Sequence, residues 1–301
     1  DTKPKVEQKE DNTNSKAYAF YLEAKHKYAK RQNIDDTEIV RGLLNKAIEI
    51  DDSLFIAKSH LGKTYSDVGE YEKAMKFYSS ALRQSKKIGD KNGTGQILLF
   101  LGEVYYYKGK IEKSLDYFYE ALGIFEETFA KSEIGIVINN IGLLISMKGD
   151  LDKALDYYEK SLAIKKELDD NLGMATILNN IGLLKSDKDD LNEALYCYKK
   201  SLAIREEFRD KSGIATVVAN MGTLYWRKGD LDKALDYLKR GLKIDYELGD
   251  KNGIGLSLSN IGIAYWNKGD LDKALDYLER SLAIRKKLQD KNGIAENFNN
   301  I

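Results

Sequence analysis

Proline, cysteine and histidine are scarce in this sequence of 301 residues, which has one proline, one cysteine and two histidines. The single cysteine, Cys197, excludes an intramolecular disulfide and any zinc or iron–sulfur site built from several cysteines. The two histidines, His26 and His60, leave residues 61–301 without the side chain that most often acts as a catalytic acid or base. The segment Gly93–Gly95 lacks the lysine and hydroxyl residue of a phosphate-binding loop. We therefore expect no enzymatic activity, no metal site and no cofactor.

A charge of one sign is also lacking, because 48 basic residues balance 48 acidic residues and the formal net charge is zero. A neutral chain has no long-range attraction to nucleic acid or to an anionic membrane. Lys286 and Lys287 of the basic run at 285–287 are matched, two repeats earlier in the pattern described below, by Glu206 and Glu207, so basic side chains do not align into a stripe. No long apolar run and no signal peptide are present. We expect a cytoplasmic protein with neither a nucleic-acid nor a membrane partner.

What the sequence does have is an internal repeat of 40 residues. One set of glycines recurs at this interval, at Gly62, Gly102, Gly142, Gly182, Gly222 and Gly262. A second set follows at a fixed distance in each unit, at Gly69, Gly109, Gly149, Asp189, Gly229 and Gly269. Six units of equal length without an insertion indicate that each unit has the same structural role.

Each unit is predicted to form two helices. Apolar residues around the first glycine follow the i, i+3, i+7 spacing of one helical face, as at Leu258, Ile261 and Tyr265. Gly262 then lies in mid-helix, where glycine costs about 1 kcal/mol relative to alanine, so we expect a neighbouring helix to approach it closely. The pair Gly269–Asp270 predicts a turn with a left-handed glycine and an aspartate that caps the next helix. The apolar stripe of that second helix comprises Leu271, Ala274, Leu275, Leu278 and Leu282.

Two short motifs recur with the repeat. Leu61–Tyr65 has the sequence Leu-Gly-Lys-Thr-Tyr, Ala74–Tyr78 follows it, and Met221–Tyr225 repeats the first motif. Together they resemble the tetratricopeptide repeat, with Leu-Gly-x-x-Tyr in the first helix and Ala-x-x-x-Phe in the second. The usual proline between units is missing and the unit is longer, a variant similar to the arrays of kinesin light chains and LGN-type scaffolds. The resemblance covers about residues 16–301, and it implies an all-α, right-handed superhelical solenoid of antiparallel helix pairs whose first helices line a concave groove.

The repeat pattern divides the chain into four parts. Residues 1–15 lack apolar periodicity, so we expect a disordered tail or linker. Residues 16–51 are predicted to form an entry helix pair of the shorter, 34-residue type, similar to the entry helices of arrays in bacterial nucleotide cyclases and transcriptional regulators. Residues 52–290 form the six 40-residue units, and residues 291–301 begin the first helix of a seventh. Because a solenoid ends in a polar capping element, we expect a fragment of a longer chain.

The resemblance implies that groove-facing side chains stand six, three and two residues before the first-helix glycine and one, four and five residues after it. Asparagine occupies the slot two before the glycine in five consecutive units. An amide offers a donor and an acceptor, so it can bind the backbone of an extended peptide, as asparagines in this slot do in related arrays. Alternatively, these amides connect adjacent helices, and the two roles are compatible. The predicted polar ladder is Asn140, Asn180, Asn220, Asn260 and Asn300.

The other slots carry apolar and aromatic side chains, the composition expected of a recognition groove flanked by amides. Both tryptophans, Trp226 and Trp266, occupy the slot four after the glycine in consecutive units. Alternatively, the two tryptophans pack between neighbouring first helices. The predicted apolar peptide-binding residues are Tyr106, Ile136, Leu143, Met147, Leu183, Trp226, Ile263 and Trp266.

We predict a non-enzymatic scaffold that binds a protein or peptide segment, extended or amphipathic-helical, in its groove. A clamp for a terminal carboxylate is not expected, because no consecutive units place basic residues in these slots. Two alternatives stay open. The array is a regulatory or sensor region of a larger bacterial signalling protein, such as a nucleotide cyclase, a kinase or a transcriptional regulator, or it is an architectural spacer or self-association module.

Overall fold

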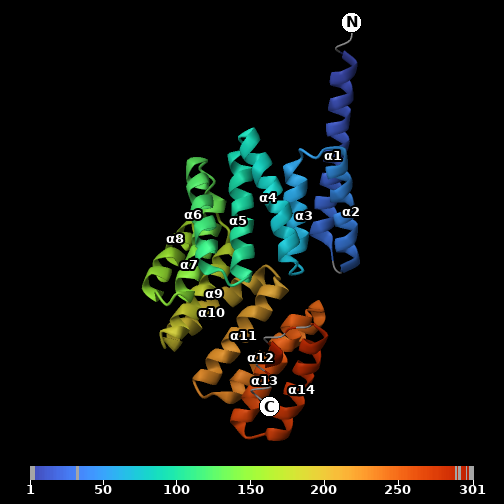
Figure 1. Ribbon diagram of the computed structural model, residues 1–301. Helices are drawn as coiled ribbons and strands as arrows, with labels where there is room; N and C mark the ends of the chain where they lie inside the picture. The colour runs from blue at the N-terminus through green and yellow to red at the C-terminus, as the bar shows by residue number, and fades with distance from the viewer. Residues whose placement is uncertain (1–3, 32–33, 289, 291–292, 296, 298–301) are drawn as a thin grey trace. The chain divides into compact units, whose positions relative to one another are not determined.

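Helix is the only regular structure in the part of the chain that the computed structural model describes, which is residues 4–31, 34–288, 290, 293–295 and 297. Figure 1 shows the helices following one another along the chain, joined by short connections. This confirms the predicted all-α class of paired helices. The helices are α1 (Pro4–Lys30), α2 (Ile34–Ile50), α3 (Phe55–Ser66), α4 (Tyr71–Ile88), α5 (Lys91–Tyr107), α6 (Ile111–Glu127), α7 (Lys131–Met147), α8 (Leu151–Glu167), α9 (Asn171–Asp187), α10 (Leu191–Glu207), α11 (Lys211–Arg227), α12 (Leu231–Leu248), α13 (Lys251–Lys268) and α14 (Leu271–Lys287).

The turn inside each 40-residue unit has the predicted chemistry. Gly269 adopts a left-handed backbone conformation with φ of 84°. Asp270 follows it, and its carboxylate accepts a hydrogen bond from the backbone N–H of Lys273 at 3.3 Å, which caps α14. In the fourth unit Asp189 replaces the glycine and adopts the same left-handed conformation, with φ of 62°. The turn geometry is therefore kept where glycine is absent, since aspartate tolerates this region better than most residues.

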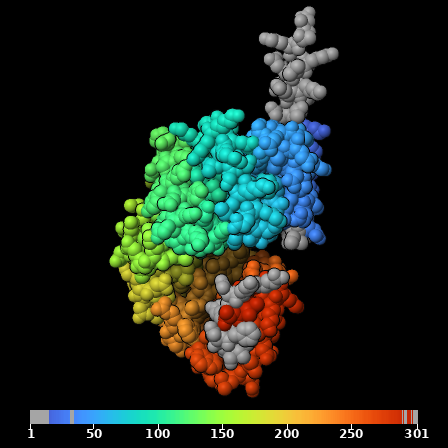
Figure 2. Space-filling model, in the orientation of Figure 1, coloured from blue at the N-terminus to red at the C-terminus, as the bar shows by residue number. Residues whose placement is uncertain are grey.

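The packing divides the chain into two compact units, residues 1–144 and residues 145–301, and the division falls inside α7. In the first unit, α1 pairs with α2, α3 with α4 and α5 with α6, and each pair packs on the next. Figure 2 shows the pairs of this unit in chain order, from blue to green. In the second unit, α9 pairs with α10, α11 with α12 and α13 with α14, and α8, α10 and α12 each pack on the following helix.

Within each unit, the first helices of consecutive pairs also contact one another. α3 contacts α5 in the first unit, and α11 contacts both α9 and α13 in the second. The first helices thus form a layer in each unit, which we call the first-helix layer. The slots that the sequence analysis defines belong to the helices of this layer.

The hydrophobic core lies between the helices of each pair and between consecutive pairs. In the second unit, Leu258 and Ile261 of α13 are fully buried. They join Leu235 and Leu238 of α12 and Ala274 of α14 in one buried cluster. Because each pair buries its apolar faces only against its neighbours, the stability of such an array is local.

The mid-helix glycines lie against buried side chains of the second helices. A Cβ built on Gly62 would lie 2.8 Å from the ring of Tyr78, and a Cβ on Gly182 would lie 2.6 Å from the ring of Tyr198. Both rings are almost completely buried. A protein interior packed to this density has no room for the methyl group of alanine, which confirms the close approach predicted for these glycines.

α1 begins at Pro4, so the helix includes residues 4–15 of the segment for which the composition predicts a tail. Two properties of this segment are compatible with helix. Proline is tolerated in the first turn because its missing N–H has no partner there, and the Lys, Glu and Gln residues that follow have high helix propensities. Most of the predicted seventh unit lies outside the described residues, which include only 293–295 and 297 of that segment.

Candidate functional site

Large apolar side chains are exposed on the first helices of the second unit. The exposed fraction is 60% for Trp266, 56% for Met147, 40% for Leu183 and 38% for Trp226. Ile263 is half-buried. The structure thus leaves these predicted groove residues open to solvent on successive first helices.

Three of the predicted groove residues lie in the first unit. Tyr106 of α5 is half-buried, and its ring centre lies 5.1 Å from that of Tyr107. Tyr107 is exposed and stacks on Tyr71 of α4, with ring centres 5.9 Å apart. On α7, Ile136 is exposed and Leu143 is half-buried. Both tryptophans lie in the second unit, which is therefore the stronger candidate for a binding surface.

The asparagine ladder is half-buried at each described position: Asn140, Asn180, Asn220 and Asn260. Asn220 Nδ2 of α11 donates a hydrogen bond to Asn179 Oδ1 of α9 at 2.9 Å. In the first unit, Asn139 Nδ2 donates to Asn140 Oδ1 at 3.3 Å. The Asn220–Asn179 bond links neighbouring first helices, which is the structural role that the sequence analysis keeps as an alternative.

The same amides retain capacity for a ligand. Asn220 uses one N–H in its bond to Asn179, and an amide has a second N–H and an oxygen with two lone pairs. The side-chain amide of Asn260 forms no hydrogen bond with the residues that the structure describes. Asn300, the last member of the predicted ladder, lies outside the described residues.

An open hollow of about 500 Å³ lies beside Trp226 of α11. Trp226 lines it together with Asn267 of α13, which stands in the slot five after Gly262. Arg227 also lines the hollow, and its Nη1 donates to the backbone oxygen and to Oγ of Ser186, each at 2.6 Å. The hollow therefore combines an aromatic wall, an amide and a guanidinium that the protein itself holds in place.

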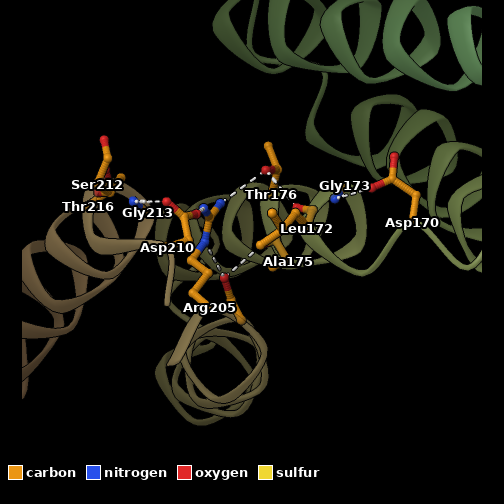
Figure 3. A network of polar contacts seen from close by, with 11 residues as sticks. Asp170, Leu172, Gly173, Ala175, Thr176, Arg205, Asp210, Ser212, Gly213 and Thr216 are labelled. Atoms are coloured by element: carbon orange, nitrogen blue, oxygen red, sulfur yellow. Dashed lines mark hydrogen bonds and ion pairs between the residues drawn. The ribbon is translucent and has the colours of Figure 1, made fainter. Parts of the chain in front are cut away.

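Polar junctions join consecutive helix pairs in the second unit, and Figure 3 shows the junction around Arg205. Arg205 of α10 is 9% exposed and its Nη1 forms an ion pair with Asp210. Its Nη2 donates to Thr176 Oγ1 of α9 at 3.0 Å. Asp210 also accepts a hydrogen bond from the backbone N–H of Gly213 at 3.0 Å and so caps α11. One guanidinium thus connects α9, α10 and the start of α11.

A second pocket, of about 310 Å³, lies between α11 and α13, and the sequence analysis missed it. Thr216 and Asn220 of α11 and Leu256 of α13 line it, and all three stand in predicted slots. Asp245 and Asp250 also line it. The sequence signal for these carboxylates is a change of charge at one repeat position, because position 245 is aspartate where positions 165, 205 and 285 are basic.

The side chains of His60 and Cys197 are engaged in packing, whereas His26 is exposed. His60 Nδ1 donates to the backbone oxygen of Ile56 at 3.0 Å, and burial lowers the pKa of its imidazole. Cys197 is buried, and burial raises the pKa of its thiol, which disfavours the reactive thiolate. In the described part of the chain, no group of three or more His, Cys, Asp or Glu residues is placed to hold a metal ion. Of the helices described, none has both the length and the apolar composition needed to cross a bilayer.

Helix pairs that pack on one another within each compact unit are typical of a helical repeat protein. Comparison with known proteins identifies the family. The sequence model of the tetratricopeptide repeat family matches residues 53–127, 133–207 and 209–287. The chain therefore belongs to the tetratricopeptide repeat family and is a repeat scaffold. A search of the curated proteins finds none that matches this chain.

Several solved structures share the fold at low sequence identity. A Rap protein complexed with competence and sporulation factor has 17% identity and a TM-score of 0.69, with 96% of each chain covered. A signal-transduction ATPase with a tetratricopeptide repeat sensor, from Pyrococcus horikoshii, has 16% identity and a TM-score of 0.68, with 94% of this chain and 42% of that chain covered. The nearly identical repeats assigned to a kinesin light chain of Podosopora anserina have 15% identity and a TM-score of 0.51, with 65% of this chain and 96% of that chain covered.

Proposed function

We propose that this chain binds a peptide segment of another protein on the first-helix layer of its second unit. The observation that carries the proposal is the exposure of both tryptophans, Trp226 and Trp266, in one slot of consecutive repeats. The fold itself does not require an aromatic residue there, because the equivalent slot holds Ser66, Ser146 and Ser186 in three other repeats. An exposed tryptophan that packing does not demand is best explained by a partner, since tryptophan is the residue most enriched among binding hot spots.

The amides supply the complementary polar contacts. Asn180, Asn220 and Asn260 come from the same three helices as the apolar residues Leu183, Trp226 and Trp266. A half-buried amide binds a peptide backbone through paired donor and acceptor groups and carries little information about the ligand's side chains. Apolar anchors then provide most of the affinity, and amides fix the course of the ligand chain. This division of roles suits an extended segment; an amphipathic helix, whose backbone groups are bonded within the helix, uses the amides less.

The likeness in fold supports a role in recognition. The Rap protein of similar fold was solved in complex with competence and sporulation factor, and the Pyrococcus horikoshii ATPase has its repeats as a sensor. In this chain the repeat scaffold is shared with both, while the residues that contact a ligand must be its own at such low identity.

The test is a selection from a randomised peptide library followed by calorimetry with the tightest peptide. Trp266→Ala is expected to weaken binding by about thirtyfold or more, which corresponds to the roughly 2 kcal/mol of a hot-spot residue. Tyr196→Ala is the matched control, because Tyr196 is an exposed aromatic residue on the second helix α10. The control is expected to bind as the unmodified chain does. Equal affinity for Trp266→Ala and the unmodified chain would place the site elsewhere and refute the proposal.

A second candidate is a sensor region within a larger signalling protein, which the likeness to the Pyrococcus horikoshii sensor favours. The same surface would then bind another segment of the parent chain. Reading the parent gene tests this: a catalytic domain encoded beside the repeats supports it, and a gene that encodes the repeats alone contradicts it.

A further inference from the structure

Three turns that follow second helices of the second unit contain a buried cation paired with an aspartate, which also accepts the backbone N–H of the glycine three residues later. Lys165 Nζ lies 2.8 Å from Asp170 Oδ2, and Arg285 Nη1 lies 3.3 Å from Asp290 Oδ2. Arg205 makes the equivalent ion pair, as described above. The three cations recur at the 40-residue interval and are each at least nine-tenths buried. Three of the four equivalent turns in the second unit thus contain an internal cation.

The turn between α12 and α13 breaks this series. Asp245 stands at the position of the cation and is 6% exposed, with Oδ2 accepting a hydrogen bond from Ser257 Oγ at 2.7 Å. Asp250 caps α13 through Oδ1, which accepts the backbone N–H groups of Asn252 and Gly253 at 3.0 and 3.1 Å. No described cation pairs with Asp250 Oδ2, the oxygen that holds the cation in the other three turns. Burial and the nearby charge of Asp250 raise the pKa of Asp245.

In the two of these turns that contain an arginine, the guanidinium fills the space beside the glycine three residues after the aspartate. A Cβ built on Gly213 would lie 1.8 Å from Nη1 of Arg205. A Cβ built on Gly293 would lie 1.7 Å from Nη1 of Arg285. The two arginines therefore occupy the same point of the repeat.

At the α12–α13 turn, two carboxylate oxygens border that point. A Cβ built on Gly253 would lie 2.7 Å from Asp250 Oδ2 and 2.8 Å from Asp245 Oδ1. The 310 Å³ pocket opens here, between α11 and α13. Its lining also includes Asn220 of the predicted ladder, and Thr216 and Leu256, which stand in predicted slots.

We propose that this pocket binds the guanidinium of an arginine side chain that the peptide ligand supplies. The ligand's arginine takes the place that Arg205 and Arg285 fill in their own turns, and donates charge-assisted hydrogen bonds to Asp245 Oδ1 and Asp250 Oδ2. The inference rests on the proposed function, because the arginine belongs to a peptide held on the same surface. The pocket gives this surface a preference for one ligand side chain, whereas the amides bind only the backbone of the ligand.

A guanidinium fits this pocket better than a metal ion does. Two facing carboxylates, one of them buried, are costly without a cation, so the site favours a positively charged ligand. The described residues offer no third His, Cys, Asp or Glu ligand here, whereas calcium takes six or more oxygen ligands and magnesium six. The planar fork of arginine donates to two oxygens at once, and this chain itself uses arginine at the equivalent point in two turns.

The experiment selects peptides from one randomised library on the unmodified chain, on Asp245→Arg and on Asp245→Ser. The first variant supplies the internal cation of the other turns, and the second carries the residue found at the equivalent position, Ser85. Thermal unfolding checks that both variants fold. We expect an arginine at one fixed position among peptides selected on the unmodified chain and no such preference on either variant. Replacing that arginine with glutamine should weaken binding to the unmodified chain by about ten- to a hundredfold and leave binding to Asp245→Arg unchanged.

The outcomes separate the two proposals. Peptides that bind all three proteins without a fixed arginine overturn the pocket assignment and leave the proposed function standing. Failure of every protein to select a peptide overturns the proposed function itself. Calcium chloride alone is the further probe: if it raises the melting temperature of the unmodified chain but not of Asp245→Ser, and arginine is not enriched, the pocket is a metal site and the arginine proposal is wrong.

Discussion

Replacing Gly182 with alanine tests whether the repeat glycine is required by packing. The new Cβ would lie 2.6 and 2.7 Å from two ring carbons of Tyr198. Carbon atoms in contact are normally about 3.5–4.0 Å apart, so the ring must move by about 1 Å. Tyr198 is 1% exposed and cannot turn into solvent. The substitution therefore over-packs a closed core.

The net effect follows from two opposing contributions. Over-packing a buried site costs about 2–3 kcal/mol when the displaced group is rigid. Alanine in place of glycine in a helix interior returns about 1 kcal/mol. We expect Gly182→Ala to lower the free energy of unfolding by about 1–2 kcal/mol.

Guanidinium chloride unfolding, followed by circular dichroism, measures this change, and Gly255→Ala is its control. Gly255 is also a helical glycine of the second unit, but the nearest atom to its built Cβ is Arg285 Cγ at 3.5 Å, an ordinary contact. The control should therefore gain up to about 1 kcal/mol. Since a repeat array can unfold locally, hydrogen exchange should show the loss concentrated in α9 and α10. A Gly182→Ala protein as stable as Gly255→Ala would refute the packing argument.

Two further predictions concern stability. Phe129 follows α6 in a left-handed conformation with φ of 55° and is 87% exposed, and glycine holds the equivalent positions at Gly89 and Gly249. Because a side chain disfavours this conformation, Phe129→Gly should raise the free energy of unfolding by about 1 kcal/mol. A fall in the denaturation midpoint would contradict this. Asp245 has a raised pKa in the folded state, so its charged form weakens the fold once the pH exceeds the pKa of the unfolded chain. Asp245→Asn should therefore be more stable than the unmodified chain at pH 7, and this gain should vanish as the pH falls below about 4; a gain that is independent of pH would contradict the assignment.

The helix pairs could be predicted from the sequence because they depend on short-range signals. The spacing of Leu258, Ile261 and Tyr265 defines one helical face, and the Gly269–Asp270 pair contains both the left-handed residue and the cap. That Trp226 and Trp266 occupy one slot of consecutive repeats also follows from the sequence. These features are set by distances along the chain.

What the sequence left open, such as the role of the amides, or missed depends on distances between helices. The hydrogen bond between Asn220 and Asn179 exists because α11 packs on α9 at the right separation, which no local pattern specifies. The pocket with Asp245 and Asp250 escaped notice because a charged residue on a second helix is normally a solvated one. Only the burial of Asp245 near the end of α12 shows that this residue stands where other repeats have a cation.

The central claim, that a peptide covers the first-helix layer of the second unit, is tested most directly by the chain's own two tryptophans. A peptide selected for tight binding and free of tryptophan is titrated into the protein while tryptophan emission and its quenching by acrylamide are measured. Covering Trp226 and Trp266 should shift the emission to shorter wavelength and protect it from acrylamide, in step with binding measured by calorimetry. Saturable binding that leaves both the emission and the quenching unchanged would contradict the account.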